Sequence, residues 1–182
     1  MRTKTASTED GLDRQLARAA AGEQAALEAL YAQTRPAVYA LALSIVKNAH
    51  DAEDVMQDVY VRVWQGAGNY RGQGTPMAWL LTVTRNLALD CRRRQAKLEP
   101  LDLEGTVFLA PAVTHEDRVL LSALLEGLEE TERQIVVLHA LGGLKHRETA
   151  ALLDLPLGTV LARYSRAVKK LRLAGKEAGL DV

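Results

Sequence analysis

The chain has 182 residues, enough for one medium domain or two small ones. Its 23 basic residues balance 23 acidic residues, so the chain is not a polycation overall, although the two signs are segregated along it. A single cysteine, Cys91, excludes an internal disulfide framework, and no apolar run is long enough to span a bilayer. Residues 1–10 also lack the apolar segment of a secretory signal. We therefore expect a protein of the reducing cytoplasm with no membrane segment of its own.

Leucine, alanine, arginine and glutamate dominate the sequence, and alternating β-branched runs bounded by turns are missing from it. This composition predicts an all-α protein. Helices are expected, in chain order, at 12–21, 24–33, 36–47, 51–64 and 77–95, and helical periodicity returns from 116 to about 173. Pro100, Gly105 and Pro111 interrupt the segment between, which has no helical period. The predicted organisation is a disordered tail (1–11), a helical domain (12–97), a flexible linker (98–116), a second helical domain (117–174) and a C-terminal tail (175–182).

The helix predicted at 51–64 has two distinct faces, with Asp51 as its expected N-cap. One face is an apolar seam made of Ala52, Val55, Met56, Val59 and Val63. The other carries Asp51, Asp54, Asp58 and Arg62 at helical spacing, with Gln57 beside them. An acidic face repels DNA, so it meets either solvent or a protein, and the residues alone favour solvent.

The helix predicted at 77–95 also separates two kinds of side chain. Its core side is Leu80, Thr84, Leu87, Ala88 and Cys91, and a separate stripe contains Trp79, Val83, Asn86, Asp90 and Arg93. An indole, an amide and a guanidinium on one stripe suit single-stranded nucleic acid, since they stack on bases, bond base edges and hold phosphates. Burial of Trp79 in the core is an equally weighted alternative. The glycine-rich loop before this helix carries Asn69, Tyr70 and Arg71 and is predicted to enclose an extruded base.

Residues 143–172 predict a helix-turn-helix whose second helix is basic. Small and apolar residues pack the first helix (Ala150, Leu152 and Leu153), Asp154 suits a left-handed turn, and Pro156 suits the start of the next helix. The inner face of the second helix is Val160, Tyr164, Ala167, Val168 and Leu171. Its outer face is Thr159, Ala162, Arg163, Arg166, Lys169 and Lys170, with no acidic residue among them. A solvated basic surface is the simpler alternative, but the preceding helix and turn favour insertion into a DNA major groove.

Catalysis is not indicated. Four histidines (His50, His115, His139 and His146) form no metal-ligand or triad spacing with Cys91, which is more simply a small buried hydrophobic residue. We therefore expect no catalytic residue, no metal and no cofactor. Two acidic stretches, 51–58 and 116–132, alternate with the basic segments and suggest a protein partner in addition to a polyanion.

Three stretches in order resemble bacterial extracytoplasmic-function (ECF) sigma factors: DAEDVMQDVYVRVW at 51–64, PMAWLLTVTRNLALDCRRR at 76–94 and the helix-turn-helix. The resemblance covers nearly all of 12–173 and implies a sigma region 2 domain followed by a region 4 domain. It implies a protein that binds core RNA polymerase and promoter DNA and directs sequence-specific initiation, with an anti-sigma factor as a further partner.

The resemblance also implies roles for residues. Asp51, Asp54, Gln57 and Asp58 would contact the β′ clamp helices of the polymerase. The stripe on 77–95 and the loop with Asn69, Tyr70 and Arg71 would melt and capture the −10 element, with Asn86 reading a base, and the outer face of 157–171 would read the −35 element. Leu161 and Ala162 depart from the lysine and serine common in the family, which leaves the details of −35 reading open. A stand-alone helix-turn-helix regulator is the alternative, but it leaves the acidic face and the Trp79 stripe unexplained.

Overall fold

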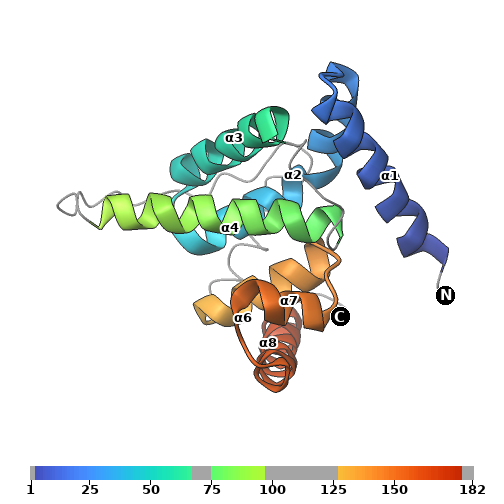
Figure 1. The fold of residues 1–182 in the computed structure, drawn as a ribbon. Coiled ribbons are helices and arrows are strands. Elements are labelled where there is room, and N and C mark those ends of the chain that lie inside the picture. The colour runs from blue at the N-terminus through green and yellow to red at the C-terminus, as the bar shows by residue number, and fades with distance from the viewer. Residues whose placement is uncertain (1–2, 67–74, 97–126, 178–182) are drawn as a thin grey trace.

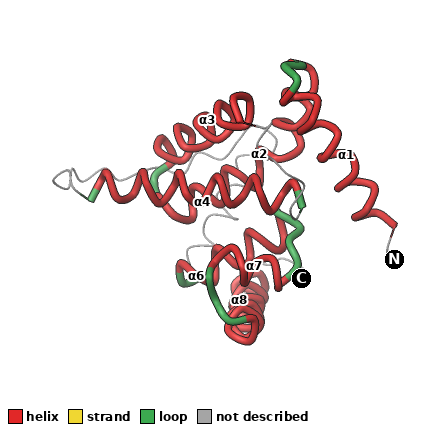
Figure 2. The backbone as a smooth tube through the Cα atoms, in the orientation of Figure 1, coloured by secondary structure: helices red, strands yellow, loops and turns green. Residues whose placement is uncertain are grey.

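The computed structural model describes residues 3–66, 75–96 and 127–177. All regular elements in these ranges are helices, which confirms the predicted all-α class (Figure 2). The predicted linker and the loop 67–74 lie outside the described residues. Among the helices described, none has the length and apolarity needed to cross a membrane.

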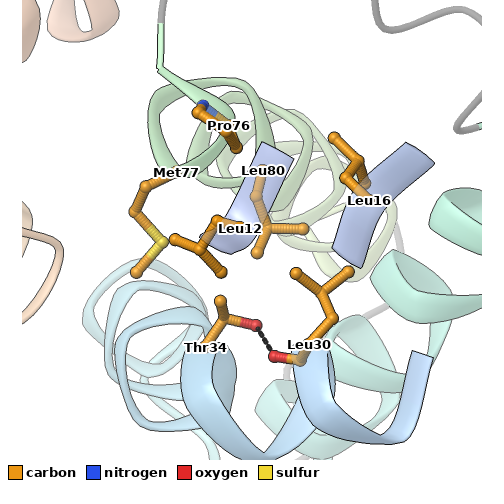
Figure 3. Close-up of a pocket in the computed structure, with 7 residues that line it drawn as sticks. All are labelled: Leu12, Leu16, Leu30, Thr34, Pro76, Met77 and Leu80. Atoms are coloured by element: carbon orange, nitrogen blue, oxygen red, sulfur yellow. Dashed lines mark hydrogen bonds between the residues drawn. The ribbon is translucent and has the colours of Figure 1, made fainter. Parts of the chain in front are cut away.

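The N-terminal domain consists of four helices: α1 (Thr3–Ala20), α2 (Gln24–Val46), α3 (Ala49–Gly66) and α4 (Pro76–Gln95). Helix α2 is central and packs against the other three, because apolar residues surround much of its circumference. A small apolar pocket remains where α1, α2 and α4 meet, and Leu12, Leu30 and Leu80 project into it (Figure 3). The hydroxyl of Thr34 turns away from this apolar space by donating to the carbonyl of Leu30, 2.7 Å away.

Three helix boundaries differ from those predicted. Helix α1 begins at Thr3 instead of Leu12, and Pro36 lies inside one continuous α2 instead of opening a separate helix. An internal proline costs a helix about 3 kcal/mol, and the near-complete burial of Val38, Leu41 and Ile45 in the same helix offsets that cost.

The helix containing the acidic face is also capped differently. Its N-cap is not Asp51 but Asn48, whose Oδ1 accepts from the Asp51 N–H at 3.1 Å. Asparagine at this position is among the preferred N-caps, so α3 starts one turn earlier than predicted. The apolar seam of α3 is buried as expected, with Ala52, Val59 and Val63 fully excluded from solvent.

The C-terminal domain is built from α6 (Glu130–Val136), a π-helical turn η2 (Val137–Leu141), α7 (His146–Leu153) and α8 (Leu157–Glu177). Helix α8 packs across α6 and α7, and Val160 and Ala167 on its inner side are fully buried. Both residues belong to the predicted inner face, which confirms the orientation of this helix.

The two domains are docked on each other. Helix α2 contacts α6 and η2, and α4 contacts α7, so that α4 lies between α3 and the C-terminal helices (Figure 1). The buried residues of the two domains consequently form one continuous cluster, in which Leu81 of α4 and Leu138 of η2 are both fully buried.

Candidate nucleic-acid and protein interfaces

The helix-turn-helix is formed by α7, a tight turn and α8. Asp154 ends α7 in the left-handed conformation, with φ of 55° and ψ of 49°. The next residues continue the turn, because the Leu155 N–H donates to the carbonyl of Ala150 at 3.0 Å. The carbonyl of Pro156 then accepts from Thr159 and Val160 and starts α8. Asp154 therefore does what the sequence predicts, and α8 emerges with its basic side away from the core.

The basic face of α8 is only partly free of internal partners. Arg163 Nη1 donates to Glu129 Oε2 at 3.1 Å, and Lys170 Nζ donates to Glu132 Oε2 at 2.7 Å. Arg166 Nε lies 3.7 Å from the other oxygen of Glu132. Three of the six predicted DNA contacts are thus held beside carboxylates of the same domain. Of the others, Ala162 and Lys169 are exposed and Thr159 is half-buried.

Glu132 is the buried centre of this arrangement, with a side chain 2 % exposed. Burial disfavours its charged form, but the hydrogen bonds from Lys170 and from the Glu129 backbone N–H outweigh that effect and hold its pKa below the usual value. The carboxylate is therefore ionised and couples the start of α6 to α8. The acidic stretch that suggested an external partner thus has an internal role in the described residues.

Two histidines stack beneath the same helix. The rings of His139 and His146 are 4.2 Å apart between centroids, and Tyr164 of α8 lies 4.9 Å and 4.8 Å from them. His139 Nδ1 donates to the carbonyl of Leu144 at 2.8 Å, whereas the buried Nδ1 of His146 has no hydrogen-bond partner among the described residues. Burial and the neighbouring His139 lower the pKa of His146. Sequence reasoning treated these histidines only as non-ligands and missed their packing role.

The predicted stripe of α4 is presented to solvent at one end and half-buried at the other. Asn86, Asp90 and Arg93 are exposed, and Arg93 Nη1 donates to Asp90 Oδ1 at 2.9 Å. Trp79 and Val83 are half-buried against the core. The indole of Trp79 thus contacts the core without being enclosed by it, and its contact with nucleic acid stays a prediction. Thr75 caps this helix by accepting from the Ala78 N–H.

The acidic face of α3 borders an open hollow against α4. The hollow is lined by Asp51, Asp54, Val55, Gln57, Asp58, Cys91, Arg94 and Gln95. All four residues predicted to contact polymerase lie along it, so the structure brings them together on one surface. Burial, reinforced by the negative charge of Asp51, raises the pKa of Cys91, which keeps this thiol neutral. Sequence reasoning had not placed Arg94 here, where it puts a positive charge opposite the carboxylates.

Some predicted residues receive no structural test. Asn69, Tyr70 and Arg71 lie outside the described residues, as does the acidic segment 116–126. Among the residues that the structure does describe, no three His, Cys, Asp or Glu side chains are grouped to hold a metal ion.

Comparisons with known proteins agree with this arrangement. Residues 30–98 match the family model of sigma-70 region 2, and residues 118–171 match that of sigma-70 region 4. The chain is 32% identical over 173 residues to the ECF RNA polymerase sigma factor SigK of Mycobacterium ulcerans, covering 90% of this chain and 92% of the relative. It is 36% identical over 165 residues to SigE of Mycolicibacterium smegmatis, covering 84% of this chain and 64% of that relative.

Solved structures show the same fold. The chain resembles CnrH, solved with the cytosolic domain of CnrY, at a TM-score of 0.62 and 28% identity over 90% of this chain and 96% of CnrH. The fold also matches that of RpoE from Bartonella quintana, solved with the anti-sigma factor NepR, at a TM-score of 0.66 and 23% identity over 82% of this chain and 96% of RpoE. The order of the two domains, the helix-turn-helix and these relatives together show that the chain belongs to the ECF RNA polymerase sigma factors, and is a promoter-recognising sigma factor.

Proposed function

We propose that this sigma factor reads its promoter with α8 and α4 and is held on core RNA polymerase by the α3 face. The observation that carries the proposal is the separation of these surfaces. The basic side of α8, the stripe of α4 and the acidic hollow between α3 and α4 are made of different residues and do not overlap. Each surface can then meet a partner of its own, namely a duplex, an unpaired strand or a protein.

Duplex reading at the −35 element is assigned to the outer face of α8. Arg166 has a side chain 60 % exposed, and Arg163 is one turn away, so both guanidinium groups are placed near a major groove into which α8 inserts. A bidentate arginine–guanine pair contributes about 1–3 kcal/mol of discrimination. Lys169 is exposed and suits a phosphate contact, which positions the helix without reading sequence.

Capture of the unpaired −10 strand is assigned to Asn86, Asp90 and Arg93, with the half-buried Trp79 and Val83 beside them. Extruding a base costs a few kcal/mol, and stacking contributes about 1–3 kcal/mol per base. Melting therefore proceeds without hydrolysis if captured bases offset the unpairing cost. Asn69, Tyr70 and Arg71 remain a predicted part of the surface that captures the strand.

Polymerase binding is assigned to Asp51, Asp54, Gln57 and Asp58, which would meet basic side chains of the β′ clamp helices. Arg94 across the hollow limits the partner to one that also offers an acidic or polar group there. The chain works as an initiation factor in the cytoplasm, with no catalytic step and no cofactor of its own. The resemblance to RpoE of Bartonella quintana, solved with the anti-sigma factor NepR, supports such a protein as its regulator.

The proposal is tested by reconstitution with core polymerase on a pool of promoter fragments. Asp54→Lys should weaken polymerase binding at least about tenfold, a change of ~1.4 kcal/mol, while affinity for isolated DNA holds or rises. Glu53→Lys is the matched control, because Glu53 is exposed on the same helix but does not line the hollow. Equal effects of the two substitutions would mean that the acidic face is merely solvated.

The same reconstitution tests −35 reading. Arg166→Ala should lose selectivity at one upstream base position by about 5- to 150-fold, with polymerase binding intact. Unchanged selectivity would remove Arg166 from the reading surface. A folded chain that never binds polymerase yet binds one duplex sequence would instead favour the stand-alone regulator.

A further inference from the structure

The contact between the two domains is specific enough to have a role. Glu130 at the start of α6 joins the two domains electrostatically: its Oε1 accepts from Arg92 Nη1 of α4 at 2.7 Å, and its Oε2 lies 3.6 Å from Lys47 Nζ at the end of α2. Burial disfavours its charge, yet the hydrogen bond from Arg92 and the positive charge of Lys47 hold the pKa of Glu130 below its usual value. The carboxylate is therefore ionised where the domains meet.

A second close contact between the domains lies about 16 Å farther along α4, at Leu81. A Cβ atom built on Gly142, just after η2, would lie 2.7 Å from Leu81 Cδ1 of α4 and 2.6 Å from the Leu138 carbonyl oxygen. Any larger residue would therefore collide with α4 as well as with its own domain. Leu81 is fully buried in this arrangement, so the contact is packed as tightly as a protein interior.

The docked face of α4 is not its predicted DNA face. On a helical wheel, Leu81, Arg85 and Arg92 lie on one side, and the stripe from Trp79 to Arg93 is centred roughly 150° away. The outer face of α8 also remains accessible, since Arg166 and Lys169 are exposed. In the docked arrangement, the stripe of α4 and the outer face of α8 are therefore each accessible to DNA when considered separately.

What docking prevents is the use of both surfaces at once. Promoter elements centred about 25 base pairs apart are separated by about 85 Å of duplex. A single compact body of this chain length has a radius of gyration of only about 16 Å. Residues 97–126 join the domains and, fully extended, can span on the order of 100 Å. The chain is therefore long enough to engage both elements, but not while α6 and η2 sit on α2 and α4.

We propose that the free protein is a closed, promoter-incompetent state in which Glu130, bridging Lys47 and Arg92, is the latch between the domains. The proposal rests on the proposed function, because closure matters only if both elements must be read together. One turn from Leu81, the Nε of Arg85 is buried without a hydrogen-bond partner among the described residues, which is an unfavourable feature of this arrangement. A closed state with such a defect is readily exchanged for contacts on polymerase and DNA.

Small-angle X-ray scattering and promoter binding test the latch. Glu130→Lys breaks two ion pairs and should shift the domain equilibrium towards the open form by about three- to thirtyfold. The radius of gyration should rise from about 16 Å towards 20 Å or more. Promoter complexes should also form faster by a similar factor when the free variant is mixed with core polymerase and promoter DNA. Raising the salt concentration should expand the wild-type protein in the same direction.

Two variants serve as controls. The triple variant Lys47→Glu, Arg92→Glu, Glu130→Lys restores opposite charges and should be compact and slow again. Glu28→Lys makes the same charge change on an exposed site of α2, about 28 Å from Lys47 along the helix, and should leave the radius of gyration at the wild-type value.

The outcomes separate this proposal from the assigned function. A wild-type protein that scatters as two separated bodies overturns the closed state, whatever its activity. A compact protein whose size and promoter-binding rate are unchanged by Glu130→Lys overturns the latch while leaving the function intact. If the holoenzyme initiates nowhere, the function fails, and the scattering results still decide whether Glu130 holds the domains together.

Discussion

Glu132 offers the sharpest test of how the C-terminal domain is held together. The substitution Glu132→Gln keeps the shape and one oxygen to accept from the Glu129 N–H, but removes the charge that pairs with Lys170 and Arg166. A hydrogen bond to a charged group contributes about 1.5–3 kcal/mol. The ammonium of Lys170 is partly screened by solvent, since its side chain is 43% exposed, and the longer Arg166 contact adds less than about 1 kcal/mol. We expect a loss of about 2 kcal/mol in the free energy of unfolding.

The assay is urea denaturation followed by two signals. Circular dichroism reports helices of both domains, whereas tryptophan emission reports the N-terminal domain, because Trp64 and Trp79 are the chain's two tryptophans. Glu132→Gln should lower the circular-dichroism midpoint more than the tryptophan midpoint. Glu129→Gln is the control: its carboxylate pairs with Arg163 but is 67% exposed, so its loss should stay below about 1 kcal/mol. If the two variants lose equal stability, the buried carboxylate is not what joins α6 to α8.

Three further predictions follow from the same domain. Lys169→Ala should weaken binding to all DNA and reduce the slope of log affinity against log salt concentration by about one. Lys170→Ala should instead mainly destabilise the fold. If the two variants behave alike in DNA binding and in unfolding, the hydrogen bond between Lys170 and Glu132 does not stabilise the domain. Stability should fall as pH drops below about 6.5, because the unfolded chain then protonates His146 before the folded chain, whose lowered pKa favours the neutral ring; a His146→Gln variant measured by urea midpoints should lose this dependence. Asp154→Val should cost about 1–2 kcal/mol at its left-handed backbone, while Asp154→Gly should be neutral or stabilising in thermal unfolding.

The sequence predicted faces of helices better than their ends. Periodicity placed Val59 in the core and Asp54 outside because burial follows the helical repeat directly. The ends of helices were harder to predict. Pro36 was interpreted as the start of a helix, because the local cost of proline is visible in the sequence whereas the tertiary burial that offsets it is not. Asp51 was predicted as the N-cap, whereas Asn48 holds that position; both residue types are good caps, and only the backbone path distinguishes them.

The candidate site was predicted in its residue types more than in its contacts. Asp54 and Gln57 were expected on one surface, and their helical spacing was sufficient for that. The pairing of Glu130 with Arg92 was not foreseen, because it joins residues 38 positions apart across two domains. No local pattern encodes such a pair. The acidic segment was therefore read as a surface for another protein, when Glu130 and Glu132 are used within this chain.

The carboxylates beside α8 also bear on how the protein searches a genome. Any DNA that takes up Arg163 or Arg166 must first displace Glu129 or Glu132. Non-specific sites offer little beyond phosphate charge, so they compete poorly with an acid already in place. A matching sequence adds base contacts and can prevail. If Arg163 and Arg166 contact DNA as proposed, Glu129 and Glu132 would compete with phosphate for them, lowering occupancy of random DNA more than that of the correct target and so raising selectivity without contacting a base.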